Sequence, residues 1–193
     1  MVIGVTGNSG SGKSEISKIL SNKINAKIID ADKVVKELYT PGQEYYNKIL
    51  ELFGNKVLEK NNKLNRNKIA EIIYNNESER EKLNNLTYKY VVDEIKKRIK
   101  KEKNINIIID APLLFESKLD EICDITVAVL AEKSLKINRI CTRDNIEQKI
   151  AISRLAIQKE DSYYQKKADY IVTNNGKKDE INLEEICTRI GKN

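Results

Sequence analysis

Short apolar runs rich in Ile and Val alternate along the chain with longer segments of helical period. Within the runs the apolar residues do not alternate with polar ones, which is typical of strands buried on both faces of a parallel sheet. The alternation of strands and helices predicts βαβ units and an α/β fold. The predicted strands are Val2–Thr6, Ala26–Asp30, Asn106–Asp110, Ile125–Leu130 and Tyr170–Thr173, and helical patterns cover 13–23, 32–39, 43–53, 67–74, 78–101 and 134–158.

The spacing of the predicted strands is uneven. A long helical segment with the turn signals Pro41-Gly42 and Gly54-Asn55 separates the second strand from the third. A crossover between parallel strands needs only one helix, so we expect an inserted helical subdomain over about 36–104. A second polar helical stretch, about 139–167, is a candidate lid. The chain is interpreted as a single domain, 1–193, whose core comprises 1–35 and 105–193.

The strongest motif lies between the first predicted strand and the first predicted helix. Residues 7–14 read Gly-Asn-Ser-Gly-Ser-Gly-Lys-Ser and match G-x-x-x-x-G-K-[ST] without a mismatch. Glycines let backbone N–H groups approach phosphate oxygens, and the start of the following helix adds positive potential. Lys13 would reach the β- and γ-phosphates, and the Ser14 hydroxyl would hold Mg²⁺. The nucleotide-binding candidates are therefore Gly10, Ser11, Gly12, Lys13, Ser14 and Glu15, the last through its backbone.

Carboxylates close two of the predicted strands. Asp30 ends the second strand and Asp32 follows it, at the sheet edge where ligands bind in open α/β folds. A carboxylate there can accept the proton of an acceptor hydroxyl, but Asp32 could equally cap the next helix. Asp110 ends the third strand and resembles a Walker B residue, which holds Mg²⁺ directly or through water. The alternative for Asp110 is a helix cap or a loop residue.

Composition narrows the chemistry. The 193 residues contain no His, which excludes Ser–His and Cys–His nucleophiles and His-ligated metal sites. The net charge of +6 suits an anionic ligand. The basic cluster at 96–101 has acidic neighbours, which favours a solvated helix face over nucleic-acid binding.

Cysteine usage and hydropathy indicate a cytoplasmic protein. The three cysteines, Cys123, Cys141 and Cys187, are far apart and form no C-x-x-C pair, which favours a reducing compartment. The first residues do not look like a signal peptide. The longest apolar stretch is broken by Asp110 and Pro112, so we expect no membrane-spanning segment.

The choice among proteins with a phosphate loop favours a small-molecule kinase. A GTPase should carry N-K-x-D after a late strand, and the segment Asn22–Asn25 lacks the Asp. Arg139 and Arg143 share a helix face, and arginines from a lid can neutralise a phosphoryl group during its transfer. The alternative is a solvated basic face paired with Asp144 and Glu147.

In combination these motifs resemble the dephospho-CoA kinase family over nearly the whole chain. The most specific is Asp-Ala-Pro-Leu-Leu-Phe-Glu at 110–116, which matches the family's D-x-P-L-L-F-E. The other similar segments are Ile3–Ser14, Ile29–Asp32, Phe53-Gly54, Leu64–Arg66, Arg139 with Arg143, Gln158, Ala168–Val172 and Asn174–Gly176. The departures are Asn8-Ser9 and Glu15 in the loop, and Tyr88-Lys89 where the family usually has His-Pro.

The resemblance implies a five-stranded parallel sheet flanked by helices, the P-loop NTPase fold. It also implies transfer of a phosphate from ATP, with Mg²⁺, to the ribose 3′-hydroxyl of dephospho-CoA. Asp32 would be the base with Asp30 beside it, Arg143 and Arg139 would come from the lid, and Asn174 and Gly176 would lie near the adenine. The candidates for the acceptor site are Thr6, Asp32, Arg66, Tyr88, Pro112 and Leu113.

Two other functions remain open at this point. One is a nucleoside or nucleotide kinase, because similar loops occur in uridine-type kinases. The other is a binding module that uses the loop as a nucleotide-gated switch, against which the paired Asp30 and Asp32 argue. For the favoured kinase we expect a monomer or weak homo-oligomer that binds neither nucleic acid nor membrane.

Overall fold

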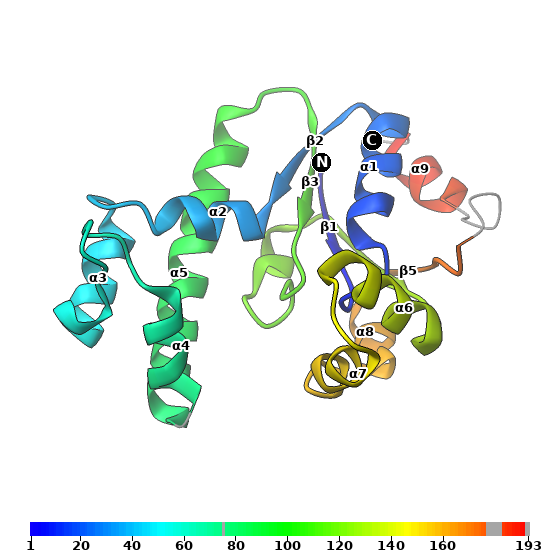
Figure 1. Ribbon diagram of the computed structural model, residues 1–193. Helices are drawn as coiled ribbons and strands as arrows, with labels where there is room; N and C mark the ends of the chain where they lie inside the picture. The colour runs from blue at the N-terminus through cyan, green and yellow to red at the C-terminus, as the bar shows by residue number, and fades with distance from the viewer. Residues whose placement is uncertain (75, 177–182, 192–193) are drawn as a thin grey trace. The chain divides into compact units, whose positions relative to one another are not determined.

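The computed structural model describes residues 1–74, 76–176 and 183–191. Five strands form one parallel sheet in the order β2-β3-β1-β4-β5 (Figure 1). All five predicted strands are confirmed with the predicted bounds: β1 is Val2–Thr6, β2 is Ala26–Asp30, β3 is Asn106–Asp110, β4 is Ile125–Leu130 and β5 is Tyr170–Thr173. The family resemblance implied this sheet, and the α/β class predicted from the apolar runs is correct.

The strands are continuous apolar runs because the centre of the sheet is covered on both faces. Every residue of β4 is buried, as are four of the five residues of β1 and of β3. Ile16 and Leu20 of helix α1 (Lys13–Ile24) pack in the same core cluster as Val5, Ile108 and Val127. This packing fixes the direction in which α1 leaves the sheet.

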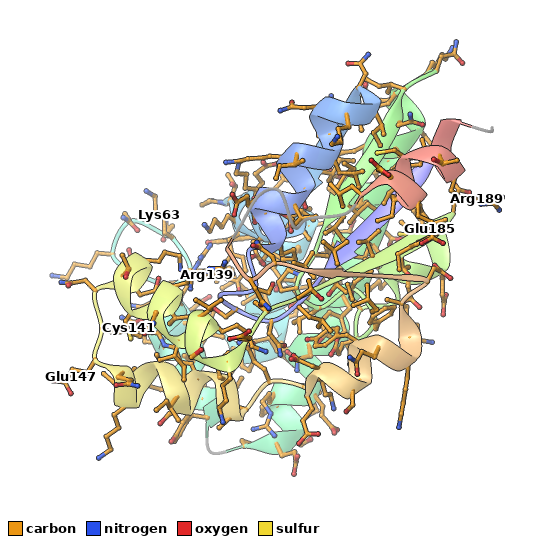
Figure 2. All side chains as sticks on the ribbon, turned by 90° about the vertical axis from the view of Figure 1, so that its right-hand side faces the viewer. Lys63, Arg139, Cys141, Glu147, Glu185 and Arg189 are labelled. Carbon is orange, nitrogen blue, oxygen red and sulfur yellow. The ribbon has the colours of Figure 1, made fainter. Side chains whose placement is uncertain are left out.

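Three helices follow β4 and include the stretch 139–167 that is predicted to be a lid: α6 (Lys133–Asp144), α7 (Gln148–Ala156) and α8 (Asp161–Lys167). The predicted helical stretch 134–158 is divided into α6 and α7 because Asn145 adopts a left-handed conformation, with φ of 50°, and ends α6. Glu147 lies at this turn (Figure 2). The helix α9 (Glu184–Gly191), which the sequence analysis did not predict, packs Ile186 and Ile190 into the sheet core.

The chain divides into two compact units, 1–29 with 102–193, and 30–101. The second unit contains α2 (Ala31–Leu38), α3 (Glu44–Phe53), the 3₁₀ turn η1 (Asn55–Val57), α4 (Arg66–Tyr74) and α5 (Glu77–Lys101). It has its own apolar core around Tyr45, Ile49 and Phe53. This unit begins earlier than the predicted insertion at 36, because α2 packs on α5.

The remaining turn in the first unit is the 3₁₀ helix η2 (Leu119–Ile122), which leads from β3 toward β4. Among the helices that the structure describes, none combines the length and the apolar character needed to cross a bilayer.

Candidate active site

The phosphate loop connects β1 to α1 and closely approaches three neighbouring segments. Gly10 and Gly12 have φ angles of 78° and 86°, in the left-handed region that favours glycine. A Cβ atom at Gly10 would lie 2.4 Å from the carbonyl oxygen of Lys136, and one at Gly12 would lie 2.1 Å from Nδ2 of Asn174. The loop therefore requires glycine at these two positions, of which the motif specifies Gly12.

Parallel pairing brings an acidic residue next to this loop. Val5 of β1 lies opposite Asp110 of β3, so Asp110 stands at the sheet edge where the loop begins. The Lys13 ammonium forms an ion pair with Asp110 Oδ1. The Lys13 side chain is 14% exposed and that of Asp110 is 6% exposed, so this ion pair is largely shielded from water. The two residues predicted to bind phosphate and Mg²⁺ thus lie together.

Several polar groups around the loop have no partner within the described residues. Ser11 is 1% exposed and Asn174 is also 1% exposed. Neither the Ser11 hydroxyl nor Nδ2 of Asn174 has a hydrogen-bond partner in the part of the chain that the structure describes. Buried polar groups are usually satisfied, so unsatisfied groups beside a phosphate loop are consistent with a site that a polar ligand completes.

The backbone N–H of Glu15, which is predicted to face phosphate, is in the first turn of α1 and donates a hydrogen bond to Gly12 O at 2.9 Å. The Ser11 N–H donates to Asn8 O at 3.1 Å. The side chains of Ser14 and Glu15 are exposed at the first turn of α1, where an anion experiences the positive end of the helix dipole.

Arg139 connects the loop to the end of β5. Its Nη1 donates to Gly10 O at 3.1 Å, to Ser11 O at 3.3 Å and to Asn174 O at 3.1 Å, and its Nη2 donates to Asn174 Oδ1 at 3.3 Å. The side chain extends from α6 toward the beginning of α1 (Figure 2). Gly176, with φ of 100°, follows in the same turn. Arg139 therefore holds backbone carbonyls in this structure, where the sequence analysis predicts a lid arginine acting on phosphate.

Arg143 lies one helical turn further along α6 and faces the loop. Its Nη2 donates to Ser9 Oγ at 3.2 Å, and its guanidinium also makes two hydrogen bonds to Asp144, at 2.8 and 3.0 Å. Arg154 of α7 donates to the same carboxylate at 2.7 Å. The hydrogen bond from Arg143 holds the pKa of the Asp144 carboxyl below its usual range. Asp144 thus orients Arg143 beside the loop.

Three candidates for the acceptor site lie at the ends of two paired strands: Thr6 ends β1, and Pro112 and Leu113 follow β3. Thr6 is fully buried, and its hydroxyl donates to Pro112 O at 3.2 Å. Thr6 therefore fixes the turn at Pro112, and its hydroxyl is not presented at a surface. Leu113 is 48% exposed and is the member of this group that faces solvent.

Comparison with known proteins agrees with these motifs. The family model described as dephospho-CoA kinase matches residues 1–180. The chain belongs to the dephospho-CoA kinase family. A dephospho-CoA kinase from Fusobacterium nucleatum is 36% identical over 190 residues, covering 98% of this chain and 95% of the relative. One from Oceanobacillus iheyensis is 33% identical over 189 residues, which cover 95% of this chain and 94% of the relative.

Solved structures support the same fold. A dephospho-CoA kinase from Campylobacter jejuni has a TM-score of 0.66 at 27% identity and covers 99% of this chain and 95% of its own. The protein TT1252 from Thermus thermophilus has a TM-score of 0.82 at 20% identity, covering 100% and 96%. A shikimate kinase from Bacteroides thetaiotaomicron reaches a TM-score of 0.54 at 14% identity, covering 100% and 97%. The last two show the fold alone, which is that of P-loop kinases.

The second unit carries the two aspartates of the dephospho-CoA kinase motif I-D-A-D. Asp30 is the N-cap of α2: its Oδ1 accepts a hydrogen bond from Lys33 N at 3.1 Å. Asp32 lies exposed in the first turn of α2. The capping role that the sequence left open for Asp32 therefore belongs to Asp30, and the Asp32 carboxylate is accessible to solvent.

The other dephospho-CoA kinase candidates in the second unit lie on α4 and α5. Arg66 begins α4, and its guanidinium lies 4.7 Å from the centre of the Tyr39 ring. Tyr88 is half-buried on α5. A cavity of about 490 Å³ lies within this unit, and its lining includes Lys89 and Tyr90 but neither Arg66 nor Tyr88.

Some contacts of the loop involve residues that carried no chemical signal in the sequence. Asp161 and Tyr164 of α8 and Lys136 of α6 belong to this group. Lys136 is 6% exposed and its ammonium donates to Asp161 at 2.8 Å. A single lysine within a polar, lysine-rich helix gives no sign in the sequence that it is buried, so the sequence offered no way to find it.

Proposed function

We propose that this chain transfers the γ-phosphate of ATP to the ribose 3′-hydroxyl of dephospho-CoA, giving CoA and ADP. The family match over residues 1–180 is the observation that carries the proposal. The Lys13–Asp110 pair and the unsatisfied Ser11 and Asn174 groups beside the loop support it independently. We place the reaction in the cytoplasm, in agreement with the cysteine usage.

Positioning and charge neutralisation account for the residue types at the loop. Phosphoryl transfer has a loose transition state, so catalysis depends mainly on placing the reactants and on stabilising negative charge. Lys13 would exchange Asp110 for the β- and γ-phosphates when ATP binds. Arg143, oriented by Asp144, would face the transferred group, and Asn174 and Gly176 would border the adenine.

The donors available for Mg²⁺ are the Ser14 hydroxyl and the Asp110 carboxylate. Oxygen donors fit this cation, which usually takes one or two protein ligands together with substrate phosphates and water. Held by these donors, Mg²⁺ would neutralise part of the negative charge of the bound phosphates.

Asp32 is our candidate for the base that accepts the proton of the 3′-hydroxyl. It is exposed at the start of α2, whereas the carboxylate of Asp30 is engaged as the helix cap. We expect Asp32→Asn to lower kcat by about 10²- to 10⁴-fold, because a general base contributes that much. The KM for ATP should change by less than about 2-fold, since phosphate binding depends on the loop.

Asp30→Ala is the matched control for this experiment. It removes the cap and should reduce stability by about 0.5–2 kcal/mol while kcat falls much less than in Asp32→Asn. Both variants are assayed by ADP release with dephospho-CoA, uridine and a nucleoside monophosphate as separate acceptors. Full turnover of Asp32→Asn would show that another residue is the base, and preference for uridine or a monophosphate would contradict the acceptor.

A further inference from the structure

The first half of the phosphate loop is held by the connection between α7 and α8. Gln158 follows the C-terminal turn of α7, where its N–H donates to Leu155 O at 3.1 Å. Its side-chain Oε1 accepts a hydrogen bond from the backbone N–H of Ser9 at 3.0 Å. The Ser9 N–H, which would otherwise face solvent or ligand, is thus hydrogen-bonded to a side chain from the connection between α7 and α8.

Asn8 makes the neighbouring connection. Its Nδ2 donates to Lys159 O at 2.9 Å and to Asp161 Oδ1 at 3.4 Å, and its Oδ1 accepts from the Tyr164 hydroxyl at 2.8 Å. Asn8 is 9% exposed and Tyr164 is 3% exposed. Residues 158–164 therefore contact both Asn8 and Ser9, and each contact satisfies a polar group that is buried or in the backbone.

The chemistry of these groups fixes their orientation. A backbone N–H can only donate, so the Gln158 carboxamide must present its oxygen to Ser9, and its NH₂ group faces elsewhere. A phenol facing a carboxamide oxygen must likewise donate, so the amide of Asn8 is oriented with its NH₂ toward Lys159. The arrangement has one consistent hydrogen-bond assignment.

Arg139 holds the other half of the loop through Gly10 O and Ser11 O, at 3.1 and 3.3 Å. The contacts from α6, from the connection after α7 and from α8 thus engage two backbone carbonyls, one backbone amide and the Asn8 side chain within residues 8–11, which precede the helix start. Restraining these residues limits the conformations of the loop, and a preorganised loop loses less entropy when it binds phosphate.

We infer that Gln158 is a positioning residue for ATP, which acts with Asn8 and Tyr164 by fixing the first half of the phosphate loop. Gln158 need not touch the nucleotide to have this effect. The inference rests on ATP being the phosphate donor, as proposed above. It predicts that loss of these hydrogen bonds weakens ATP binding while the chemical step and the acceptor site keep their properties.

The decisive variant is Gln158→Met, which keeps the length and approximate volume of the side chain but removes the acceptor for Ser9. A neutral hydrogen bond corresponds to about a 2- to 10-fold change in an equilibrium constant, so the KM for ATP should rise by about that factor. The kcat and the KM for dephospho-CoA should each stay within about 2-fold of the wild-type values. In ¹H–¹⁵N spectra the Ser9 amide should shift upfield and exchange faster with solvent.

Gln148→Met is the matched control, because Gln148 is exposed at the first turn of α7, the helix that Gln158 follows. It should leave the KM for ATP and the Ser9 amide unchanged. Tyr164→Phe is a second, independent variant that removes the donor to Asn8 and keeps the ring. It should also raise the KM for ATP. Added to Asn8→Ala it should change the KM little further, because Asn8→Ala already removes the hydrogen bond between these two side chains.

The same assay separates this inference from the proposed function. Failure of the wild-type protein to phosphorylate dephospho-CoA would contradict the function itself. With an active wild type, an unchanged KM for ATP in folded Gln158→Met would overturn the inference. A fall in kcat and in melting temperature, together with a rise in both KM values, would also overturn it, because that pattern indicates general destabilisation.

Discussion

The ion pair between Lys13 and Asp110 should be an important source of stability before any nucleotide binds. Asp110→Asn keeps the shape of the side chain and removes its charge. The Lys13 ammonium, on a side chain only 14% exposed, then loses its ion pair with Asp110. We expect this variant to be less stable than the wild type, although it still carries every residue of the phosphate loop.

The magnitude follows from the shielding of the pair. Removing one partner of a buried ion pair costs about 3–5 kcal/mol, whereas an exposed pair contributes about 0–1 kcal/mol. Because Lys13 keeps some contact with water, we expect about 3 kcal/mol. For a chain of this length that corresponds to a fall in melting temperature of about 6–12 °C. Lys13→Met should cost a similar amount, since it leaves Asp110 buried and unpaired.

The assay is thermal unfolding of the nucleotide-free protein, with a double-mutant cycle. Lys13→Met combined with Asp110→Asn should cost little more than either single change, because the second substitution removes the charge that the first left unpaired. Lys27→Met is the control: it breaks the ion pair with Glu102, in which the Lys27 side chain is 54% exposed, and should cost less than about 1 kcal/mol. Additive losses in the double variant, or a melting temperature of Asp110→Asn within about 2 °C of wild type, would refute the reasoning.

Two further predictions concern the loop and its supports. Arg139→Lys should raise the KM for ATP by about 10- to 100-fold in initial-rate assays, because a lysine cannot reach the carbonyls of Gly10, Ser11 and Asn174 together. A fall in kcat at constant KM would instead place Arg139 on the transferred phosphate. Burial raises the pKa of the Tyr164 phenol above its usual value, so the folded state disfavours its ionised form. The stability that the neutral phenol contributes is present below about pH 10 and is lost as pH rises further. Tyr164→Phe should therefore show a shallower fall in melting temperature above pH 10 than the wild type. Parallel curves of melting temperature against pH for the variant and the wild type would contradict this.

Local sequence patterns were sufficient to predict the strands of the sheet and the phosphate loop. The strands were predictable because a buried parallel strand consists of consecutive apolar residues, so its signal lies in adjacent positions. The glycines, Lys13 and Ser14 were predictable for the same reason, since the phosphate loop is a continuous segment. The division of 134–158 into two helices was missed because Asn145 is one of several polar residues there, and its left-handed conformation leaves little trace in the sequence.

The roles of individual side chains depended on the local backbone conformation or on partners that are distant in the chain. The sequence placed Asp30 and Asp32 together at a strand end, but only the structure shows that Asp30 caps α2 and that Asp32 is exposed. It paired Arg139 with Arg143 on one helix face, but only the structure shows Arg139 bonded to carbonyls of the loop.

The sequence by itself determined the fold class, the phosphate loop and the family, because each is encoded in contiguous or periodic residues. Only the tertiary structure decided what supports that loop. Asn8 and Tyr164 are 156 residues apart, and Ser9 and Gln158 are 149 apart. Such contacts form where the ends of parallel strands and the helices that follow them converge, and their geometry depends on packing across the whole sheet edge, which no local pattern specifies.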